Sequence, residues 1–307
     1  MKLIHQAERL GPGERAVCLA IGVFDGVHLG HQQIIRRTVA DARQYGARSV
    51  VVTFDRHPNA VVAPDHVPAR IYTPSQKSRA ISALGVDALL GIVFDRAFSE
   101  KPGDRFVHEL AAGFGRIHSI CVGADFVFGH RRSGNVALLE QLGQELHYQV
   151  HGLAAVALDG QTVSSTRIRE EIRAGHLDAA GEMLGRPYTL CGQVVTGDQI
   201  GRQLGFPTAN LEAADLVLPP NGVYAAVTKL RGHLYRAALN IGRRPTVASA
   251  SPALRVEAHL LNFSGDLYHQ ELELEIGAKL RDEIRFGSPA QLREQIERDV
   301  AAIRGLV

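Results

Sequence analysis

Residues 22–31 read GVFDGVHLGH, and this stretch decides the fold of the first part of the chain. An apolar run, Ala16–Val23, leads into it, and Leu29–Tyr45 follows with apolar residues at helical spacing. The stretch is therefore predicted to form the turn between a β-strand and a helix. Unpaired N–H groups at the start of a helix can hold an anion, and glycines let the backbone approach a ligand closely. This pattern indicates a ligand site at the turn.

Apolar runs and helical patterns keep alternating up to about residue 183. Strands are predicted at 49–54, 88–94 and 117–122, and helices at 75–84, 104–112 and 136–142. Regular alternation of this kind implies right-handed βαβ units around a parallel sheet, whose ligands bind at the carboxyl ends of the strands. We therefore expect residues 1–184 to form an α/β domain with a doubly wound, Rossmann-like parallel sheet.

Beyond residue 184 the pattern changes to short runs of alternating polar and apolar residues. Strands are predicted at 188–195, 223–230, 235–241, 255–263 and 271–276, and one amphipathic helix at 289–304. Short strands separated by turn residues are typical of an antiparallel barrel or sandwich. We therefore expect a second domain over residues 185–307, built from antiparallel strands and closed by a C-terminal helix.

Composition narrows the class of protein. The chain has 307 residues, of which 45% are hydrophobic and 21% charged, as in a globular protein of two domains. Its net charge is only +2 and its basic residues are scattered, which argues against nucleic-acid binding. The three cysteines are widely spaced, so they form neither a disulfide framework nor a metal site, and Cys18 and Cys121 lie in apolar runs that predict burial.

The location of the protein is expected to be the cytoplasm. The charged residues Lys2, Glu8, Arg9, Glu14 and Arg15 precede any apolar run, which argues against a signal peptide. No segment is long and apolar enough to span a membrane, so no membrane partner is expected.

Two histidines carry the chemistry of the first turn. His28 and His31 are three residues apart at the start of a helix, so both rings can project to the same side. Beside a helix N-terminus, two imidazoles suit the oxygens of a triphosphate and the charge that develops as pyrophosphate leaves. Capping or a surface position is the simpler alternative, and zinc binding is disfavoured because no third ligand lies nearby.

Two later segments support an anion site at the same edge of the sheet. Residues 123–129, GADFVFG, directly follow a predicted strand, and residues 163–169, VSSTRIR, open a helix. Arginine in a first helical turn opposes the helix dipole, and a bound anion would offset that cost. A serine that only caps the helix, Ser164 or Ser165, is the alternative.

The combination of GxFDGxHxGH with SSTxIR is similar to the nucleotidylyltransferase superfamily. The sequence as a whole resembles the bacterial bifunctional riboflavin kinase/FAD synthetases, over essentially the full length of the chain. The resemblance implies that His28 and His31 contact ATP phosphates, and that Asp125 lies near the ribose or flavin phosphate. It further implies direct attack of the FMN phosphate on the α-phosphorus of ATP. Other residues assigned by it to ATP and its phosphates are Gly22, Phe24, Asp25, Gly26, Gly30, Ser164, Thr166 and Arg169.

A second site is indicated by residues 201–210, GRQLGFPTAN. No GxxxxGK[ST] sequence occurs, so a P-loop is excluded as the source of kinase chemistry. Gly201 and Gly205 allow close approach to phosphates, while Thr208 and Asn210 supply hard oxygen ligands suited to Mg²⁺. The stretch is similar to the riboflavin kinase signature GRxLGFPTAN.

That resemblance implies further roles in the second domain and a small antiparallel β-barrel as its fold. Glu257 would be the general base toward the ribityl hydroxyl, in the phosphoryl transfer from ATP. The residues that would bind the flavin are Asn240, Arg281, Glu283 and Phe286.

The resulting hypothesis is a cytoplasmic enzyme that uses ATP and Mg²⁺ to convert riboflavin to FMN and then to FAD, as a monomer or weak homo-oligomer. The chain departs from the family at Ala258, at Asn135 and at 57–62, HPNAVV, where a phenylalanine pair is common. One alternative is therefore a riboflavin kinase whose adenylyltransferase module is weak or inactive on FMN. A transferase with another acceptor and a non-catalytic flavin or nucleotide sensor are the remaining alternatives.

Overall fold

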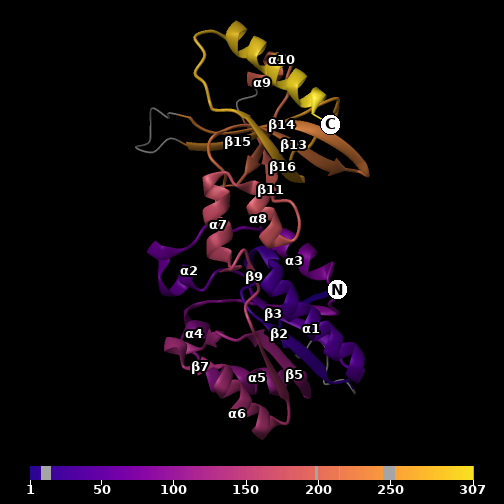
Figure 1. The fold of residues 1–307 in the computed structure, drawn as a ribbon, viewed down its shortest axis with the longest axis vertical. Helices are drawn as coiled ribbons and strands as arrows, with labels where there is room; N and C mark the ends of the chain where they lie inside the picture. The colour runs from indigo at the N-terminus through magenta and orange to yellow at the C-terminus, as the bar shows by residue number, and fades with distance from the viewer. Residues whose placement is uncertain (8–14, 198–199, 214, 245–252, 307) are drawn as a thin grey trace. The chain divides into compact units, whose positions relative to one another are not determined.

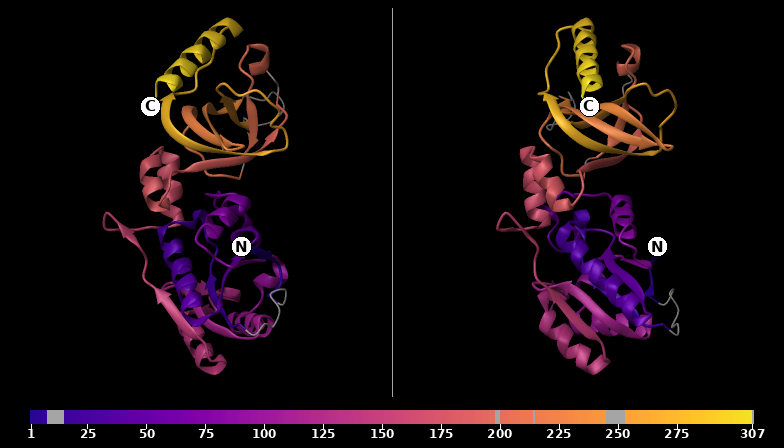
Figure 2. Two further views of the ribbon diagram at one scale, coloured as in Figure 1. Left: turned by 90° about the vertical axis from the view of Figure 1, so that its right-hand side faces the viewer. Right: turned by 45° about the vertical axis from the view of Figure 1, so that its right-hand side comes forward.

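The computed structural model describes residues 1–7, 15–197, 200–213, 215–244 and 253–306. They form two compact units, one of Met1–Ala69 with Pro74–Ser165 and one of Arg70–Thr73 with Thr166–Val307 (Figures 1 and 2). Glu8, Arg9 and Glu14, whose charge entered the expectation about a signal peptide, lie outside the described residues. The predicted division between residues 184 and 185 stays a prediction.

The first unit is built on a parallel sheet with the strand order β1-β4-β3-β2-β5-β8. Every neighbouring pair in this sheet runs parallel, so the predicted doubly wound α/β fold is confirmed. The strands of this sheet are β1 (Lys2–Ile4), β2 (Val17–Ile21), β3 (Arg48–Phe54), β4 (Ala88–Ile92), β5 (Ile117–Gly123) and β8 (Gln149–Leu153).

Helices cover both faces of the sheet because successive strand residues point to opposite sides. Leu19 and Ile21 pack in the same core cluster as Phe106 and Leu139, on the face covered by α5 (Gly103–Phe114) and α6 (Val136–Leu146). Ala20 packs on the other face, in a cluster with residues of α1 (Leu29–Tyr45) and α3 (Pro74–Ser82). The remaining elements are α2 (Asn59–Val62), α4 (Arg96–Ser99), β6 (Val127–Phe128), β7 (Gly134–Asn135), β9 (Ala157–Leu158), β10 (Gln161–Thr162) and the 3₁₀ turns Asp25–Val27, Pro64–His66 and His130–Arg132.

The order of the strands fixes where a ligand can bind. Strands β3, β4 and β1 lie on one side of β2, whereas β5 and β8 lie on the other. The topology therefore switches direction between β2 and β5, where the carboxyl ends of the strands leave a crevice. The 22–31 turn follows β2 and residues 123–129 follow β5, so both predicted segments flank this switch point.

The second unit contains a closed barrel with the strand order β11-β12-β15-β14-β13-β16. All its strand pairs are antiparallel, so the predicted small barrel is confirmed. Helices α7 (Ser165–Ala174) and α8 (Leu177–Leu184) precede it in the chain. The strands are β11 (Thr189–Val195), β12 (Ala209–Glu212), β13 (Gly222–Leu230), β14 (His233–Arg244), β15 (Ala253–Leu260) and β16 (Glu271–Arg281), with the short helix α9 (Ile200–Gln203) before β12.

The C-terminal helix α10 (Pro289–Gly305) lies against the barrel, as the yellow helix in Figure 1 shows. Two residues of the helix, Val300 and Ile303, are buried and pack against Leu261 and the partly buried Phe206 and Ile296. Ser288 caps the helix by accepting the N–H of Gln291, and Pro289 follows at the first helical position. The amphipathic stripe predicted at 289–304 thus docks on the strands.

Two further expectations can be compared with the described part of the chain. Cys18, Cys121 and Cys191 are all buried and none forms a disulfide among the described residues, which confirms burial of the first two. Among the described residues, none of the helices combines the length and apolar character needed to cross a bilayer.

Candidate active sites

The turn over residues 22–31 has a strained backbone. Phe24 and Val27 adopt φ values of 53° and 42°, in the left-handed region, and Gly26 adopts 77°. For residues with a Cβ, such conformations cost on the order of 1 kcal/mol or more and cluster at functional sites. Glycine at position 26 adopts its left-handed conformation without this cost.

Two other glycines of the turn leave room for aromatic rings. A Cβ on Gly22 would lie 3.0 Å from the ring of Phe24, and one on Gly30 would lie 3.3 Å from the ring of His28. Phe24 is almost fully buried and meets His31 edge to face, with ring centroids 5.2 Å apart. The glycines thus allow the turn to close around its own rings.

The histidines form a stacked pair. Their ring centroids are 3.5 Å apart with an angle of 23° between the planes, which confirms that both rings project to one side. His28 is also the N-cap of α1, because its Nδ1 accepts the backbone N–H of His31 at 3.4 Å. Capping and presentation of the imidazoles are therefore combined in this residue.

His31 is held as a neutral imidazole. Burial lowers its pKa well below the ordinary value of 6.5, and electrostatic interactions with His28 and Lys77 lower it further. Its Nδ1 is buried and has no hydrogen-bond partner among the residues that the structure describes. A buried polar nitrogen without a partner is costly, so this atom is suited to a ligand oxygen.

Lys77 of α3 is a residue that sequence reasoning missed. Its Nζ donates to the carbonyls of Val23 and Phe54, at 3.3 Å and 3.0 Å, and to Oγ1 of Thr53 at 3.2 Å. The ammonium therefore joins the carboxyl ends of β2 and β3 behind the histidine turn. The signal that could have found it is the one used for residues 163–169, a cation in the first turn of a helix.

The predicted site residues that follow the turn in the sequence do not all lie in the same unit as the turn. Oγ of Ser165, which we did not assign to the site, donates to the carbonyl of Asp25 at 3.0 Å. Asp125 is exposed in the turn after β5. Ser164 is half-buried at the end of the first unit, whereas Thr166 and the buried Arg169 lie in α7 of the second unit. Contacts of these residues with ATP remain predictions.

An aromatic pocket of about 460 Å³ opens beside the histidine turn. Ile21 and Val23, at the end of β2, form part of its wall, so it lies at the switch point of the sheet. Phe126 and Phe128 stack in it with ring centroids 5.3 Å apart. The other phenylalanines that line it are Phe54, Phe94, Phe98 and Phe106.

This pocket bears on the departure from the family at residues 57–62. Pro58 and Val62 lie in its wall, where the resemblance led us to expect phenylalanines, and other elements supply the rings. Basic side chains also line it, including Arg131 and Arg132. An apolar slot with a basic border suits a planar ring system that carries a phosphate. The amide of Asn135 has a separate role, because its Oδ1 caps α6 by accepting the N–H of Leu138.

The predicted residues of the second unit gather in a pocket of about 270 Å³. They come from α9, from the segment between α9 and β12, from strands β12, β14, β15 and β16, and from the segment that follows β16. Gly205, with φ 90°, is the predicted residue that does not line it. The predicted residues in its wall are Gly201, Thr208, Asn210, Asn240, Glu257, Arg281, Glu283 and Phe286.

The register of three neighbouring strands brings three polar residues of this pocket into one row. Glu257 on β15 pairs with Asn210 on β12 and with Asn240 on β14. Directly paired residues point to the same face of a sheet, so the carboxylate lies in a row between two carboxamides. A base flanked by neutral polar groups in a pocket can take a proton from a bound hydroxyl.

The glycine-rich segment before β12 packs closely around the predicted metal ligands. A Cβ on Gly197 would collide with the carboxamide of Asn210, and one on Gly201 would lie 3.3 Å from the side chain of Thr208. Glycine at these two positions therefore leaves the room that the amide and the hydroxyl occupy. Two hard oxygen donors beside open space fit Mg²⁺, which takes its other ligands from phosphates and water. Among the described residues, no group of three or more His, Cys, Asp or Glu side chains is arranged so that it could hold a metal ion.

Arg281 is fixed by an ion pair at the helix end of the pocket. Its guanidinium donates from Nε and Nη2 to the carboxylate of Asp299 on α10, at 3.0 Å and 2.7 Å. Gln295 donates to the same carboxylate at 2.9 Å, and the ring of Phe286 lies 5.9 Å from the guanidinium carbon. The carboxylate of Glu283 lies where a Cβ on Gly242 would be. Sequence reasoning missed Asp299, which lies in the predicted helix.

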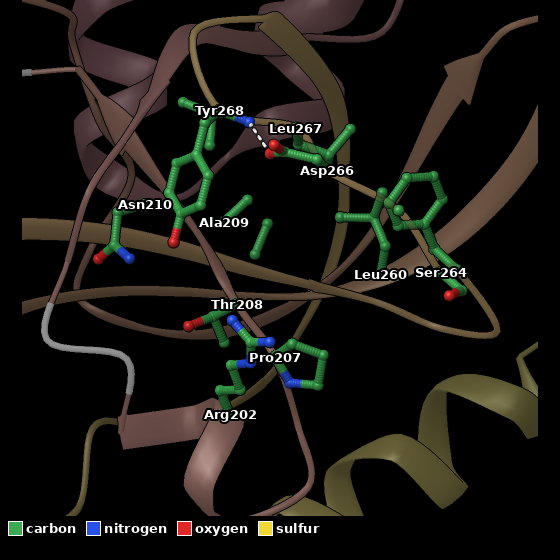
Figure 3. Close-up of a pocket in the computed structure, with 14 residues that line it drawn as sticks. Arg202, Pro207, Thr208, Ala209, Asn210, Leu260, Ser264, Asp266, Leu267 and Tyr268 are labelled. Atoms are coloured by element: carbon green, nitrogen blue, oxygen red, sulfur yellow. Dashed lines mark hydrogen bonds between the residues drawn. The ribbon is translucent and has the colours of Figure 1, made fainter.

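A larger barrel pocket, of about 530 Å³, adjoins the 270 Å³ pocket, and Thr208 and Asn210 line both. Figure 3 shows Arg202, Thr208, Asn210 and Tyr268 around this space. Asp266 accepts the backbone N–H of Tyr268 at 2.8 Å, which fixes the turn that carries the tyrosine. Phosphates placed between the two pockets would therefore meet the predicted metal ligands.

Both halves of the chain match models of known families. Residues 12–167 match the model described as FAD synthetase, and residues 184–307 match the model described as riboflavin kinase. The chain is 36% identical over 298 residues to a protein of Haemophilus influenzae, covering 97% of this chain and 95% of that protein. It is 37% identical over 306 residues to one of Pseudomonas fluorescens, covering 100% and 98%. Both relatives are named bifunctional riboflavin kinase/FMN adenylyltransferase.

A solved structure has the same fold along the whole chain. It is a macrolide-efflux protein from Streptococcus pneumoniae, with a TM-score of 0.81, 27% identity and coverage of 99% of both chains. The sheet and the barrel are therefore shared, in the same order, by a protein of low sequence identity.

Proposed function

The chain belongs to the bifunctional riboflavin kinase/FMN adenylyltransferase family, and from this premise we propose which residues perform its two reactions. The kinase reaction moves the γ-phosphoryl group of ATP to riboflavin and gives FMN and ADP. The adenylyltransferase reaction joins FMN to the adenylyl group of ATP and gives FAD and pyrophosphate. The matched families support one reaction in each half of the chain.

For the kinase, riboflavin binds in the smaller barrel pocket and ATP in the larger one. The observation that carries this proposal is that Thr208 and Asn210 line both pockets. The terminal phosphate of a nucleotide and the ribityl chain of a flavin then meet at these two residues. Asn240, Arg281, Glu283 and Phe286 surround the flavin, and Gly201 and Gly205 leave the backbone open to phosphates.

Glu257 acts as the general base of phosphoryl transfer. The terminal ribityl hydroxyl loses its proton to the carboxylate as its oxygen bonds to the γ-phosphorus, and the bond from that phosphorus to the β,γ-bridging oxygen breaks. The position of Glu257 between Asn210 and Asn240 supports this role, because the strand register sets the carboxylate on the same face as the predicted metal ligand Asn210. Thr208 and Asn210 would hold Mg²⁺, which neutralises phosphate charge when it is bound.

For the adenylyltransferase, the histidine turn holds the phosphates of ATP. The stacked rings of His28 and His31, with an unpartnered Nδ1 on His31, support hydrogen bonding to phosphate oxygens. An FMN phosphate oxygen attacks the α-phosphorus and the bond to the bridging oxygen of pyrophosphate breaks, without a covalent enzyme intermediate. The turn residues Gly22, Phe24, Asp25, Gly26 and Gly30 shape this site, and Ser164, Thr166 and Arg169 orient the phosphates.

The flavin ring of FMN enters the aromatic pocket beside that turn. Phe126 and Phe128 supply stacked rings, and Arg131 and Arg132 supply positive charge for the phosphate. Asp125 stays a candidate for the ribose or flavin phosphate region. This pocket argues against the alternative of a weak adenylyltransferase module, since the missing phenylalanine pair is replaced by rings from other elements.

The protein is further proposed to act in the cytoplasm, as a monomer or weak homo-oligomer, on small molecules without nucleic-acid or membrane partners. The near-neutral charge of +2 supports the absence of a nucleic-acid partner.

The substitution Glu257→Gln tests the kinase assignment. FMN formation from riboflavin should fall by about 100-fold or more, because general base catalysis of this kind contributes about 10²- to 10⁴-fold. FAD formation from supplied FMN should keep its rate. Glu275→Gln is the matched control, because Glu275 is an exposed strand glutamate outside the lining of both barrel pockets. Unchanged FMN formation in Glu257→Gln would refute the assignment.

A further inference from the structure

The proposed base of the kinase is bonded to an arginine that the assignments above leave without a role. Nη1 of Arg255 donates to Oε1 of Glu257 at 3.2 Å. The residues are two apart on β15, so both side chains leave the same face of the strand. Both line the smaller barrel pocket, with 29% and 25% of their side chains exposed.

The carboxylate of Glu257 is engaged on one side only. Among the residues that the structure describes, the hydrogen bond from Arg255 is the one that its side chain makes, and it involves Oε1. Oε2 is therefore the oxygen left to take a proton from a bound hydroxyl. A carboxylate that can rotate would present this oxygen in many directions, whereas a tethered one presents it in few.

The other charged groups of the pocket are arranged differently. Arg281 is paired with Asp299 on α10, and His259 contacts the carbonyl of Pro207 through Nδ1 at 2.8 Å. Glu283 lies over Gly242, which is the residue paired with Arg255 on the neighbouring strand β14. In the pocket wall, the cation that contacts Glu257 is thus Arg255, while Arg281 is directed toward α10.

We propose that Arg255 is a positioning residue of the kinase reaction. It holds Oε1 of Glu257 and thereby directs Oε2 toward the riboflavin hydroxyl that attacks ATP. The proposal rests on the proposed function, because it requires Glu257 to be the base. Arg255 itself need touch neither substrate, and its effect on the rate passes through the carboxylate.

The substitutions Arg255→Gln and Arg255→Lys test this role in the full-length protein. Arg255→Gln should lower kcat for FMN formation by about tenfold and leave KM for riboflavin within about twofold, because a misdirected base slows the chemical step rather than binding. Arg255→Lys should regain most of the lost rate, because a single N–H···O contact is within reach of an ammonium group. An unchanged kcat in Arg255→Gln would overturn the proposal.

A double-mutant cycle separates positioning from direct contact with the phosphates. If Arg255 acts through Glu257, then adding Arg255→Gln to Glu257→Gln should change kcat by less than about twofold, because the carboxylate it directs is gone. A further tenfold loss in that background, or a tenfold rise in KM for ATP, would mean that Arg255 serves the nucleotide and would overturn the proposal.

Failure of the underlying assignment gives a different result. Full kinase activity in Glu257→Gln alone would refute the base and the positioning role together. Strong loss in Glu257→Gln combined with wild-type kcat in Arg255→Gln would overturn the positioning role alone. An unchanged KM for riboflavin shows in each variant that the barrel pocket is still formed, and FAD formation from supplied FMN reports on the first unit.

Discussion

The two sites of this chain are built in opposite ways. The histidine site is local, since one turn over residues 22–31 carries both the glycines and the two stacked rings, and Lys77 and Ser165 only support its backbone from outside. The barrel site is assembled, since Asn210, Glu257 and Asn240 meet only through the register of three strands. A local site depends on backbone conformation, whereas an assembled site depends on strand pairing across the whole domain.

This contrast indicates how each site should fail. A change in the turn alters one compact structure that caps a helix and carries the ligand groups together. A change in the barrel removes one contributor while the strands keep the others in place. Variants of the first site should therefore lose the adenylyl reaction as a whole, and variants of the second should lose separable properties.

The largest effect is expected from His28→Ala. FAD formation from FMN should fall by about 10²- to 10³-fold, because a preorganised donor to a developing phosphate charge is removed, while FMN formation stays unchanged. His28→Asn is the matched control, because asparagine restores the helix cap but not the imidazole. Rates of both products are measured from separate flavin substrates. Full recovery in His28→Asn would show that the residue acts only as a cap, and equal loss of both products would contradict the assignment of one site to each unit.

A smaller and more selective effect is expected from Asn210→Ala in the barrel. The Mg²⁺ concentration for half-maximal FMN formation should rise on the order of tenfold, because one of two protein oxygen donors is lost. Asn210→Asp keeps an oxygen at this position and should need no more Mg²⁺ than the unmodified protein. Mg²⁺ is titrated at constant ATP in both reactions. An equal shift in the FAD reaction would contradict the assignment of Asn210 to the kinase reaction alone.

The aromatic pocket of the first unit should affect FMN binding in the adenylyl reaction and leave riboflavin binding in the barrel unchanged. Phe126→Ala should raise KM for FMN in the adenylyl reaction by about two- to tenfold, since a stacked ring contributes roughly 0.5–1.5 kcal/mol. KM for riboflavin in the kinase reaction should not change. Tyr45→Ala is the control, because this aromatic residue of the same unit is half exposed and lies outside the pocket. A KM for FMN that is unaltered in Phe126→Ala would place the flavin elsewhere.

The smallest effect is expected in thiol labelling, which compares the stability of the two units because each unit has a buried cysteine outside the two sites. Burial raises the pKa of Cys121 to about 12, so at pH 8 the group is the unreactive thiol rather than the thiolate. Cys121 in the sheet and Cys191 in the barrel should both resist a thiol reagent until their unit opens. Labelling followed by mass spectrometry gives the two rates. Immediate reaction of Cys121 in the native protein would contradict its burial.

The sequence predicted the fold class of both halves, and its success followed the strength of local signals. Helix α1 was predicted with both ends at Leu29 and Tyr45, because His28 caps it and Gly46 ends it with φ 62°. Strand β16 was predicted to end at Ile276 but reaches Arg281, since Gly277 and Lys279 interrupt its apolar alternation. No strand was predicted at residues 209–212, which form β12, because no local pattern indicates its pairing with β15.

Site residues were predictable where one segment carries them. The histidine turn could be found from its glycines and the spacing of its histidines. The aromatic pocket could not, because Phe54, Phe98 and Phe126 come from separate elements and follow no period. Glu257 was assigned through the family resemblance alone, although its pairing with Arg255 follows the two-residue alternation of a strand. Contacts that depend on tertiary pairing therefore need the structure, or the record of a family.

The wall shared by the two barrel pockets has a consequence for the order of events in the kinase. Thr208 and Asn210 border both spaces, so a molecule in either space changes the surroundings that the other molecule meets. Nucleotide and vitamin should then influence the affinity of each other, and thermodynamic linkage requires this influence to be equal in both directions. The barrel is thus expected to favour the state in which both substrates are bound. After turnover, bound ADP should likewise slow the release of the newly formed FMN.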